Sequence, residues 1–586
     1  MKQFFKFTLA TILGIVCVGV FFGIVSFAMM ASMVASSSSK PSVKDGTVLR
    51  ISLTGTLNER AQENPFAELL GSDLLDKQGL DDIIKAVRVA KDNDKIKGIY
   101  IEGGALAADF ASLEELRKAL VDFKTSKKFI VSYADTYTQG SYYIASTADK
   151  VLLNPDGMLD WHGIASQPIF YTDLLKKVGV KMQVFKVGTY KSAVEPFILT
   201  GMSDANRQQV QSFVGDIWSS VCKDVAASRK LPVDSLNSYA DRYAVLASSE
   251  EYVKMHLVDS LAYIDGVRDV LRKLSEKEKV NFISTAELAK LDEPKSSDEQ
   301  IAVYYAEGDI VDQVASSPAQ GTQIVGSKVV EDLDRLASDD KVKAVVLRIN
   351  SGGGSAYASE QMWRAVQLLK KKKPVIVSMS GMAASGGYYM SCGADYIFAE
   401  PTTLTGSIGI FGMIPDASEL LTEKLGLHFD VVKTNAASDF GAQGRPFNAQ
   451  EAAAMQAYVN NGYRQFLSRV AAGRNMKVED VDKIAQGRVW TGRQALGIKL
   501  VDRLGTLDDA IAEAAKRAKV QDFAVSAFPE KTQWTDQLLA ATTKKDYLEE
   551  KLQTTLGVYY APMKFVSTLS GQAKLQARMF YVPNLN

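Results

Sequence analysis

Ser385 and Lys191 are the candidates in this sequence for a catalytic nucleophile and its base. The apolar run 374–380 before the serine predicts a buried strand, and the small residues of 383–391 predict a helix that opens at Ala383. A hydroxyl on such a turn is exposed, and the free N–H groups of a helix start can stabilise a developing oxyanion. The sequence therefore predicts a nucleophilic serine on a strand-to-helix turn, with an ordinary tight turn as the alternative.

The pattern Ala-x-Ser-x-Gly around Ser385 is close to the Gly-x-Ser-x-Gly turn that presents the nucleophile in many hydrolases. A serine hydroxyl is a poor nucleophile unless a base removes its proton. The three histidines stand far apart in the sequence and give a Ser-His-Asp triad little support; they are His162, His256 and His428. Lysine is the other available base.

Lys191 can act as that base only if its amine is uncharged. A reference pKa of about 10.4 leaves about one lysine in 10³ neutral near pH 7, so burial has to lower the pKa by roughly 2–3 units. The neighbours in the sequence are apolar enough for this, namely Val184, Phe185, Val187 and Tyr190. A surface lysine on a loop is the alternative.

The glycine-rich stretch 350–355 follows a predicted strand, 342–349, and precedes a predicted helix, 358–369. Such a loop presents backbone N–H groups to an anion, but it lacks the Gly-Lys-Ser/Thr ending and the Rossmann spacing of nucleotide-binding loops. Two interpretations of this loop stay open: an oxyanion hole and a plain tight turn. Ser407, in Leu-Thr-Gly-Ser-Ile-Gly, offers a second hydroxyl, for which a structural role is expected on this pattern alone.

The composition excludes several classes of protein. With 586 residues and 46% apolar content, the chain has room for more than one domain and for large cores. The charges of the 68 basic and 68 acidic residues cancel, so the chain has no net charge that would attract nucleic acid. Three scattered cysteines, at positions 17, 222 and 392, fit neither a disulfide framework nor a zinc site. We expect no metal and no other cofactor.

An uncharged apolar run at 7–34 follows two lysines near the N-terminus. It exceeds the length needed to cross a bilayer and is too long for a typical signal-peptide core. The positive charge before it predicts a cytoplasmic N-terminus, with the rest of the chain on the periplasmic side of the inner (cytoplasmic) membrane. We expect a single-pass transmembrane anchor with the lipid bilayer as a partner; a cleaved signal peptide is the alternative.

Strand-like and helix-like stretches alternate after a polar linker at 36–44. Strands are predicted at 47–53, 96–101 and 129–133, and helices at 81–92 and 113–123. This alternation implies βαβ units around a mostly parallel sheet, which is an α/β fold.

The same order of motifs returns about 246 residues later, which indicates a duplication. The matching stretches are 95–101 with 341–347, 140–146 with 386–392, 148–155 with 394–401, and 257–261 with 500–504. The predicted parts are an anchor and linker at 1–45, an N-terminal repeat with the lysine at 46–295, a C-terminal repeat with the serine at 296–525, and a tail at 526–586. Within the tail, residues 548–569 have an amphipathic pattern that would suit assembly or membrane contact.

The two copies differ at the reactive positions. Where the second copy has Ser385, the first has Gln139, and where the first copy has Lys191, the second has Ser438. Each copy therefore lacks one of the two reactive groups. If these groups work together, one chain makes one complete site and one dead site.

Four motifs together resemble the signal peptide peptidase A (protease IV) family in its long, tandem-repeat form. They are Asn350-Ser-x-Gly-Gly, Met382-Ala-Ala-Ser-Gly-Gly-Tyr-Tyr, Leu404-Thr-Gly-Ser-Ile-Gly and Gly188-Thr-Tyr-Lys-Ser-Ala-Val-Glu-Pro. The resemblance covers residues 46–525 in the same order, and the N-terminal anchor adds to it. It implies two tandem modules of the Clp-protease/crotonase-like fold and a membrane-anchored serine endopeptidase that uses a Ser/Lys dyad.

The resemblance also implies a role for each matching residue. Ser385 corresponds to the nucleophile and Lys191 to the general base, and Ser407 corresponds to the hydroxyl that orients the lysine. The backbone N–H groups of Gly354 and Gly386 correspond to the oxyanion hole.

The family further implies a bowl-like homo-oligomer, a tetramer, that cleaves signal-peptide remnants and other apolar peptides through an acyl-enzyme. The sequence departs from the family at Gly352, where proline usually precedes the Gly-Gly pair, and this loosens the loop. Two alternatives stay open at this point: a crotonase-like acyl-CoA enzyme, whose fold also stabilises oxyanions with backbone amides, and a non-catalytic membrane scaffold. The sequence also leaves open whether the serine and the lysine meet within one chain or between subunits.

Overall fold

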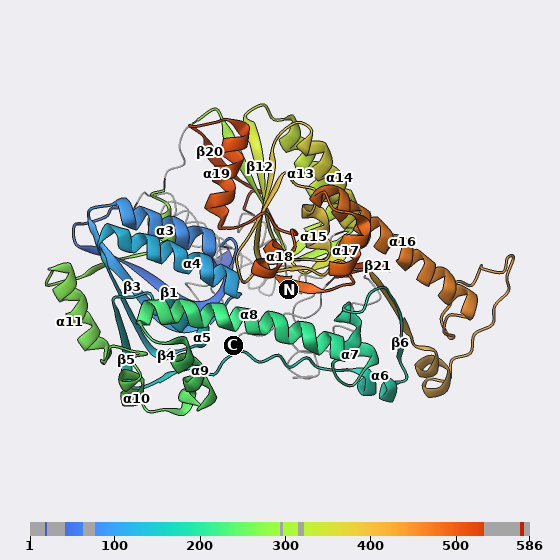
Figure 1. The fold of residues 1–586 in the computed structure, drawn as a ribbon, viewed down its shortest axis with the longest axis horizontal. Coiled ribbons are helices and arrows are strands. Elements are labelled where there is room, and N and C mark those ends of the chain that lie inside the picture. The colour runs from blue at the N-terminus through green and yellow to red at the C-terminus, as the bar shows by residue number, and fades with distance from the viewer. Residues whose placement is uncertain are drawn as a thin grey trace, which may run out of the picture.

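The structure, a computed structural model, describes residues 41–61, 77–292, 297–313, 322–531 and 575–578, together with four isolated N-terminal positions at 14, 18, 19 and 21. Two α/β halves lie side by side, the first coloured blue to green and the second yellow to red (Figure 1). Each half is built around its own sheet, and a third sheet contains strands of both halves.

The sheet of the first half has strands that run parallel to all their neighbours. Its order is β2-β1-β3-β4-β5-β7, and β8 also pairs with β1. The strands are β1 (Thr47–Asn58), β2 (Lys77–Gly79), β3 (Ile96–Ala107), β4 (Phe129–Tyr137), β5 (Lys150–Leu159), β7 (Ser260–Leu261) and β8 (Asn281–Ser284).

The sheet of the second half repeats this arrangement. The parallel run β20-β9-β12-β14-β15-β19 corresponds to β8-β1-β3-β4-β5-β7, and β16 and β18 extend the sheet beyond β14. The strands are β9 (Gln300–Glu307), β12 (Val342–Ser351), β14 (Val375–Ala384), β15 (Tyr396–Ala399), β16 (Leu404–Gly406), β18 (Val489–Thr491), β19 (Arg503–Leu504) and β20 (Ala524–Phe528). Every residue of β14 is buried, as expected of a central strand with both faces covered.

Helices cover the sheets of both halves. Those of the first half are α3 (Leu80–Asp92), α4 (Phe110–Phe123), α5 (Gln139–Ala145), α6 (Thr172–Val178), α7 (Glu195–Ile198), α8 (Asp204–Arg229), α9 (Val233–Asp241), α10 (Ser249–Lys254), α11 (Ile264–Ser275) and α12 (Thr285–Ala289). Those of the second half are α13 (Gly326–Ser338), α14 (Ala356–Lys370), α15 (Gly386–Ser391), α16 (Ala449–Arg474), α17 (Val478–Ile484), α18 (Gly492–Gly497) and α19 (Leu507–Ala518). The long helix α8 runs from the first half along the lower side of the second (Figure 1).

The third sheet joins the two halves. Its order is β11-β10-β13-β21-β17-β6, in which β6 (Lys181–Lys186) comes from the first half and β21 (Leu575–Arg578) from the tail. The other strands belong to the second half and are β10 (Asp309–Val311), β11 (Gln323–Val325), β13 (Gly353–Ser355) and β17 (Phe411–Asp416). Antiparallel pairing of β6 with β17 carries the chain that follows β6, including Lys191, into the second half.

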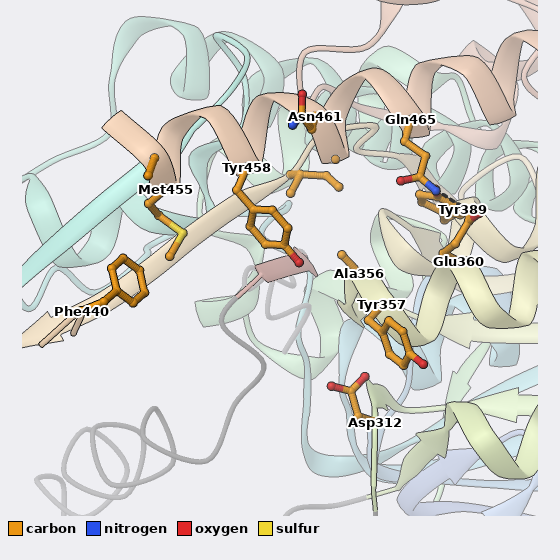
Figure 2. Close-up of a pocket in the computed structure, with 13 residues that line it drawn as sticks. Asp312, Ala356, Tyr357, Glu360, Tyr389, Phe440, Met455, Tyr458, Asn461 and Gln465 are labelled. Carbon is orange, nitrogen blue, oxygen red and sulfur yellow. Dashed lines mark hydrogen bonds between the residues drawn. The ribbon is translucent and has the colours of Figure 1, made fainter. Parts of the chain in front are cut away.

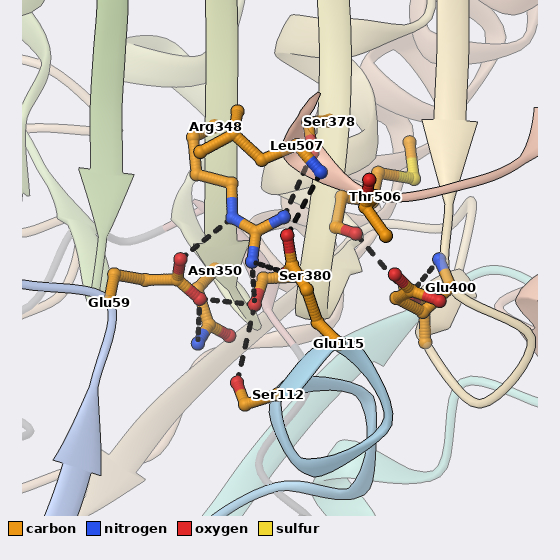
Figure 3. A network of polar contacts seen from close by, with 12 residues as sticks. Glu59, Ser112, Glu115, Arg348, Asn350, Ser378, Ser380, Glu400, Thr506 and Leu507 are labelled. Atoms are coloured by element: carbon orange, nitrogen blue, oxygen red, sulfur yellow. Dashed lines mark hydrogen bonds and ion pairs between the residues drawn. The ribbon is translucent and has the colours of Figure 1, made fainter. Parts of the chain in front are cut away.

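A buried cluster of charges also holds the halves together (Figure 3). Arg348 on β12 of the second half lies between Glu59 and Glu115 of the first, with its Nε 2.7 Å from the Glu59 carboxylate. The same guanidinium donates to the hydroxyls of Ser378 and Ser380. Burial raises the pKa of Glu59, and the positive charge of Arg348 acts against that rise. All three charged side chains are at most 5% exposed, so each depends on the others for its stability.

The predicted strands and helices are present, and most extend by a few residues beyond the predicted ends. The predicted start of the helix at Ala383 is wrong, because α15 begins only at Gly386. Ala383 and Ala384 remain extended since they pair with Thr405 and Gly406 of β16. A local preference for helix thus gives way to two more residue pairs in the sheet.

The predicted transmembrane run at 7–34 lies outside the described residues, apart from the four isolated positions. Among the residues that are described, none of the helices combines the length and the apolar character needed to span a bilayer. The predicted boundary at 295/296 falls within residues 293–296, and the amphipathic stretch 548–569 falls within the tail; both are outside the described ranges.

We predict that Arg348→Met lowers the free energy of unfolding by about 3–5 kcal/mol, because it leaves two buried carboxylates without their cation. Urea unfolding measures this change. The matched control is Arg88→Met, which removes another ion pair between the halves, Arg88 with Asp508, whose side chains are 46% and 60% exposed. The control should cost less than about 1 kcal/mol. Equal losses in the two variants would contradict a stabilising role for the buried cluster.

Candidate active site

The turn that carries Ser385 joins β14 to α15. Ser385 has φ 54° and ψ −110°, a backbone conformation that residues with a Cβ rarely adopt. Hydrogen bonds on both sides hold it there: its N–H donates to the Gly406 carbonyl over 2.8 Å, and the Tyr389 N–H donates to its carbonyl over 2.8 Å. Strained residues of this kind cluster at functional sites, where the surrounding structure maintains them.

Lys191 lies on a turn between β6 and the short 3₁₀ helix η3 (Ser192–Val194). The Tyr190 N–H donates to the Gln486 carbonyl of the second half over 2.9 Å. The side chain of Gln209 on α8 donates to the Tyr190 carbonyl over 3.0 Å and accepts from the Val489 N–H over 3.2 Å. Groups of both halves therefore fix the backbone next to the lysine.

Two glycines of the second half leave room for the lysine. A Cβ on Gly487 would lie 2.6 Å from the N, Cα and Cβ atoms of Lys191, and Gly487 has φ +83°. A Cβ on Gly409 would lie 3.2 Å from the lysine Cδ and 2.9 Å from the Cα of Gly487. Neither position tolerates a side chain without displacement of the lysine or of its support. No sequence motif indicated Gly487, because the contact joins segments that are distant in the chain.

The structure brings Lys191, Ser385 and Ser407 together within one chain. The lysine Nζ lies 2.8 Å from the Ser385 Oγ, 3.0 Å from the Ser407 Oγ and 3.1 Å from the Ser407 carbonyl oxygen. Ser407 also has a positive φ, 48°, and its N–H donates to the Arg488 carbonyl over 2.7 Å. The three residues that the sequence predicted for the site thus meet around one nitrogen.

Burial controls the charge of this lysine. Lys191 is 1% exposed, and loss of hydration lowers its pKa to about 7. No carboxylate of the described residues contributes to this shift. An uncharged amine has two N–H groups and one lone pair. One N–H can go to the Ser407 carbonyl and the other to the Ser407 hydroxyl, which leaves the lone pair for the proton of the Ser385 hydroxyl.

The glycine-rich loop lies against the start of α15. A Cβ on Gly353, which has φ +97°, would lie 2.6 Å from the amide nitrogen of Gly386. Gly354 has no space for a side chain either, since a Cβ there would lie 2.0 Å from the Ile310 carbonyl oxygen. The first N–H groups of a helix have no partner within it, so Gly386 can donate outward. The two predicted oxyanion donors, Gly354 and Gly386, therefore lie on segments in direct contact.

A pocket of about 730 Å³ opens beside this loop. Tyr458 on α16 and Ala356 on α14 lie on opposite sides of it, with Tyr357 and Asp312 at one end (Figure 2). Its wall combines aromatic, aliphatic and a few polar side chains, a mixture typical of ligand sites. Across the described ranges, no three His, Cys, Asp or Glu side chains are grouped as metal ligands are.

In the first half, the side chain of Gln139 fills the turn that corresponds to the Ser385 turn. The Gln139 side chain, 1% exposed, donates to the Gly163 carbonyl over 3.0 Å and accepts from the Gly163 and His162 N–H groups. Ser438, the counterpart of Lys191, is exposed on a loop and contacts Thr434 and Asn435. The first half therefore has an amide where the second half has a hydroxyl, and the four matched positions form one Ser/Lys pair, Lys191 with Ser385.

Comparison with known proteins identifies related sequences. The model of Peptidase family S49 matches residues 122–280 and again 367–521, and that of Clp protease matches residues 315–403. Protease 4 of Salmonella typhi is 37% identical over 87% of this chain and 84% of its own length, and Protease 4 of Haemophilus influenzae is 34% identical over 92% and 91%. The chloroplastic serine protease SPPA of Arabidopsis thaliana is 30% identical over 82% of this chain and 70% of its own.

One solved structure, a mutant of ClpP1 from Listeria monocytogenes, aligns with 36% of this chain and 94% of that one. Its TM-score is 0.25 and its sequence identity 14%, so the likeness is distant.

We predict that the stability of the wild type depends on pH in a way that Lys191→Met removes. A lysine in the unfolded chain has a pKa of about 10.4, whereas burial holds that of Lys191 at about 7. Between these values the unfolded state binds more protons, so wild-type stability rises with pH across this window and is lost as pH falls towards 7. Across this window, the free energy of unfolding of the wild type should rise by at most about 5 kcal/mol relative to that of Lys191→Met.

Urea unfolding of both proteins between pH 7 and 10 measures the effect. The matched control is Lys176→Met on the exposed surface of α6, which should follow the wild type at every pH. A constant difference in stability between wild type and Lys191→Met across this range would contradict a depressed pKa.

Proposed function

The chain belongs to peptidase family S49 and is a serine peptidase, and from this premise we propose that Ser385 is its nucleophile and Lys191 its general base. The observation that carries the proposal is the 2.8 Å contact between the lysine Nζ and the serine Oγ at a site where burial lowers the lysine pKa to about 7. A base is most effective when its pKa lies near the working pH. Membership in a peptidase family sets aside the acyl-CoA enzyme and the scaffold.

In the acylation step, the Ser385 Oγ attacks the carbonyl carbon of the substrate while Lys191 Nζ takes its proton. The Gly354 and Gly386 N–H groups stabilise the oxyanion that forms. The lysine then gives the proton to the departing amine, and the acyl group stays on the serine as an ester.

In the deacylation step, Lys191 takes a proton from a water molecule that attacks the ester, and Ser385 regains its hydroxyl. Ser407 holds the lysine through its hydroxyl and its carbonyl, so the amine keeps its direction while its charge changes. This role requires a fixed backbone at Ser407, and the positive φ of that residue is consistent with a conformation maintained for function.

The substrates of this proposal are cleaved signal peptides and other apolar peptides. The apolar part of the 730 Å³ pocket supports this choice. The run at 7–34 anchors the chain in the inner membrane with its N-terminus in the cytoplasm, so that both halves work in the periplasm. The chain assembles as a homo-oligomer, a tetramer, which rests on the family resemblance of its motifs.

We predict that Ser385→Ala and Lys191→Ala each lower kcat/KM for an apolar test peptide by at least about 10⁴-fold while the fold is retained. In the wild type, kcat/KM should rise with pH through about 7, because only the neutral amine can accept the proton. Steady-state kinetics across this range, with circular dichroism of each variant, test both statements. Peptide cleavage by folded Ser385→Ala, or a rate that rises only near pH 10, would contradict the dyad.

We also predict that Gly487→Ala lowers kcat by about 10²-fold, because its methyl group displaces Lys191 by a fraction of an ångström or more. The matched control is Gly497→Ala, whose Cβ would have nothing within 4 Å. The control should keep wild-type kinetics. If both variants behave alike, close packing of Gly487 against the lysine is not required for catalysis.

A further inference from the structure

One buried glutamine contacts the residues on both sides of the proposed base. Gln209 on α8 is 2% exposed, and the nitrogen of its side-chain amide lies 3.0 Å from the Tyr190 carbonyl oxygen. The same nitrogen lies 3.0 Å from the Ser192 Oγ. Lys191 is the residue between these two contacts. The amide nitrogen of Gln209 therefore holds the lysine turn from both ends.

The oxygen of the same amide binds the second half. It accepts from the N–H of Val489, the first residue of β18, over 3.2 Å. The carbonyl of the preceding residue, Arg488, accepts from the Ser407 N–H over 2.7 Å. Ser407 in turn holds the lysine Nζ through its hydroxyl and its carbonyl. Gln209 is therefore connected to the lysine amine along two paths, one through the lysine turn and one through Ser407.

The partners of the Gln209 amide determine which way it points. A backbone carbonyl can only accept a hydrogen bond and a backbone N–H can only donate one, so the nitrogen faces Tyr190 and the oxygen faces Val489. The Asn206 side chain, one turn earlier on α8, also accepts from the nitrogen, over 3.1 Å. An apolar side chain at this position would leave these buried hydrogen-bonding groups without their partner.

The two copies differ at this position as they differ at the lysine. Helices α8 and α16 both have 26 residues, and their N-caps are Ser203 and Asn448. Counted from these caps, Gln209 corresponds to Ala454. The half that has Ser438 in place of the lysine therefore lacks the amide as well. This difference associates the glutamine with the presence of the lysine.

The charged side chains beside the lysine turn have other partners. The Glu195 carboxylate accepts from the Ser203 hydroxyl and from the Asn206 side chain. The Arg488 guanidinium lies over the Tyr190 ring. Burial is the cause that lowers the lysine pKa to about 7. The charge state of the amine therefore reports how well the surrounding segments exclude water from it.

We propose that Gln209 is a positioning residue of the peptidase reaction, which keeps the lysine turn and β18 at a fixed separation so that Lys191 and Ser407 stay aligned. This inference rests on the proposed function, because the lysine that Gln209 positions is the proposed base. The hydrogen-bond partners of Gln209 named above do not line the pocket of about 730 Å³. We therefore expect Gln209 to affect the chemical steps and not substrate binding.

Removal of the amide should change the rate in two ways. The Tyr190 carbonyl and the Val489 N–H lose a buried partner, so the lysine turn and β18 are free to move apart. A displaced amine is less well aligned with the Ser385 hydroxyl, which lowers kcat. Water that enters between the two segments hydrates the amine and raises the lysine pKa towards its ordinary value. The pH at which the rate reaches half its maximum should therefore rise.

Steady-state kinetics of Gln209→Ala with an apolar test peptide between pH 6 and 10 test the inference. We expect kcat at pH 7 to fall by about 10- to 10²-fold, with KM within about twofold of the wild type. The midpoint of kcat/KM against pH should rise by about one unit or more, so the difference from the wild type narrows at high pH. The matched control is Gln208→Ala, at the exposed position before it, which accepts from the Tyr190 hydroxyl over 3.3 Å. The control should keep the wild-type values.

A second variant covers the case in which circular dichroism shows that Gln209→Ala does not fold. Gln209→Glu has nearly the same shape but replaces the amide nitrogen with a second oxygen, which as an ionised group cannot donate to the Tyr190 carbonyl. Its negative charge near the lysine also favours the charged amine, so the midpoint should rise by more than about one unit. An unchanged midpoint in folded Gln209→Glu would contradict the positioning role.

Three results separate this inference from the proposed function. If Gln209→Ala is less stable in urea but keeps the kcat and the midpoint of the wild type, Gln209 has only a structural role and the dyad stands. A fall of kcat by the same factor at every pH would also overturn the inference, because it would indicate fewer active molecules rather than a displaced amine. If folded Ser385→Ala and Lys191→Ala cleave the peptide as the wild type does, the proposed function itself is wrong.

Discussion

Pairing between strand β6 of the first half and strand β17 of the second is the interaction on which the site depends. Six consecutive residue pairs, from Lys181 with Asp416 to Lys186 with Phe411, hold the two strands in register. The chain then turns once and delivers Lys191 to the Ser385 hydroxyl. A shift of the register by one residue would turn the lysine away from the serine. Hydrogen bonds to the second half therefore fix the position of Lys191, which belongs to the first half.

The site also depends on the burial of Lys191, which lowers the lysine pKa to about 7, so that about half of the amines are uncharged at neutral pH. A desolvated amine is stable only if its polar atoms have partners, which here are Ser385 and the hydroxyl and carbonyl of Ser407. The buried cluster of Arg348, Glu59 and Glu115 joins the same two halves at a second place.

Much of this arrangement could be predicted from the sequence, because its signals are local or repeated. Hydrophobic runs gave the strands, the repeated motifs gave two matching halves, and the differences between copies pointed to Ser385 and Lys191. The rest depends on contacts between distant segments. Nothing near Gly487 in the sequence indicated that it faces the lysine, and nothing in the tail indicated that β21 pairs with β13. Local preference also misplaced the start of α15, where sheet pairing prevails.

The most direct test of this account is the charge of Lys191 itself. NMR titration of the full chain with isotope-labelled lysine side chains reports the protonation of each amine, and comparison with Lys191→Met assigns the signal. One lysine signal should titrate with a midpoint near pH 7 and be missing from the spectrum of the variant. A Lys191 signal that stays protonated until about pH 10, like that of a lysine in water, would contradict it.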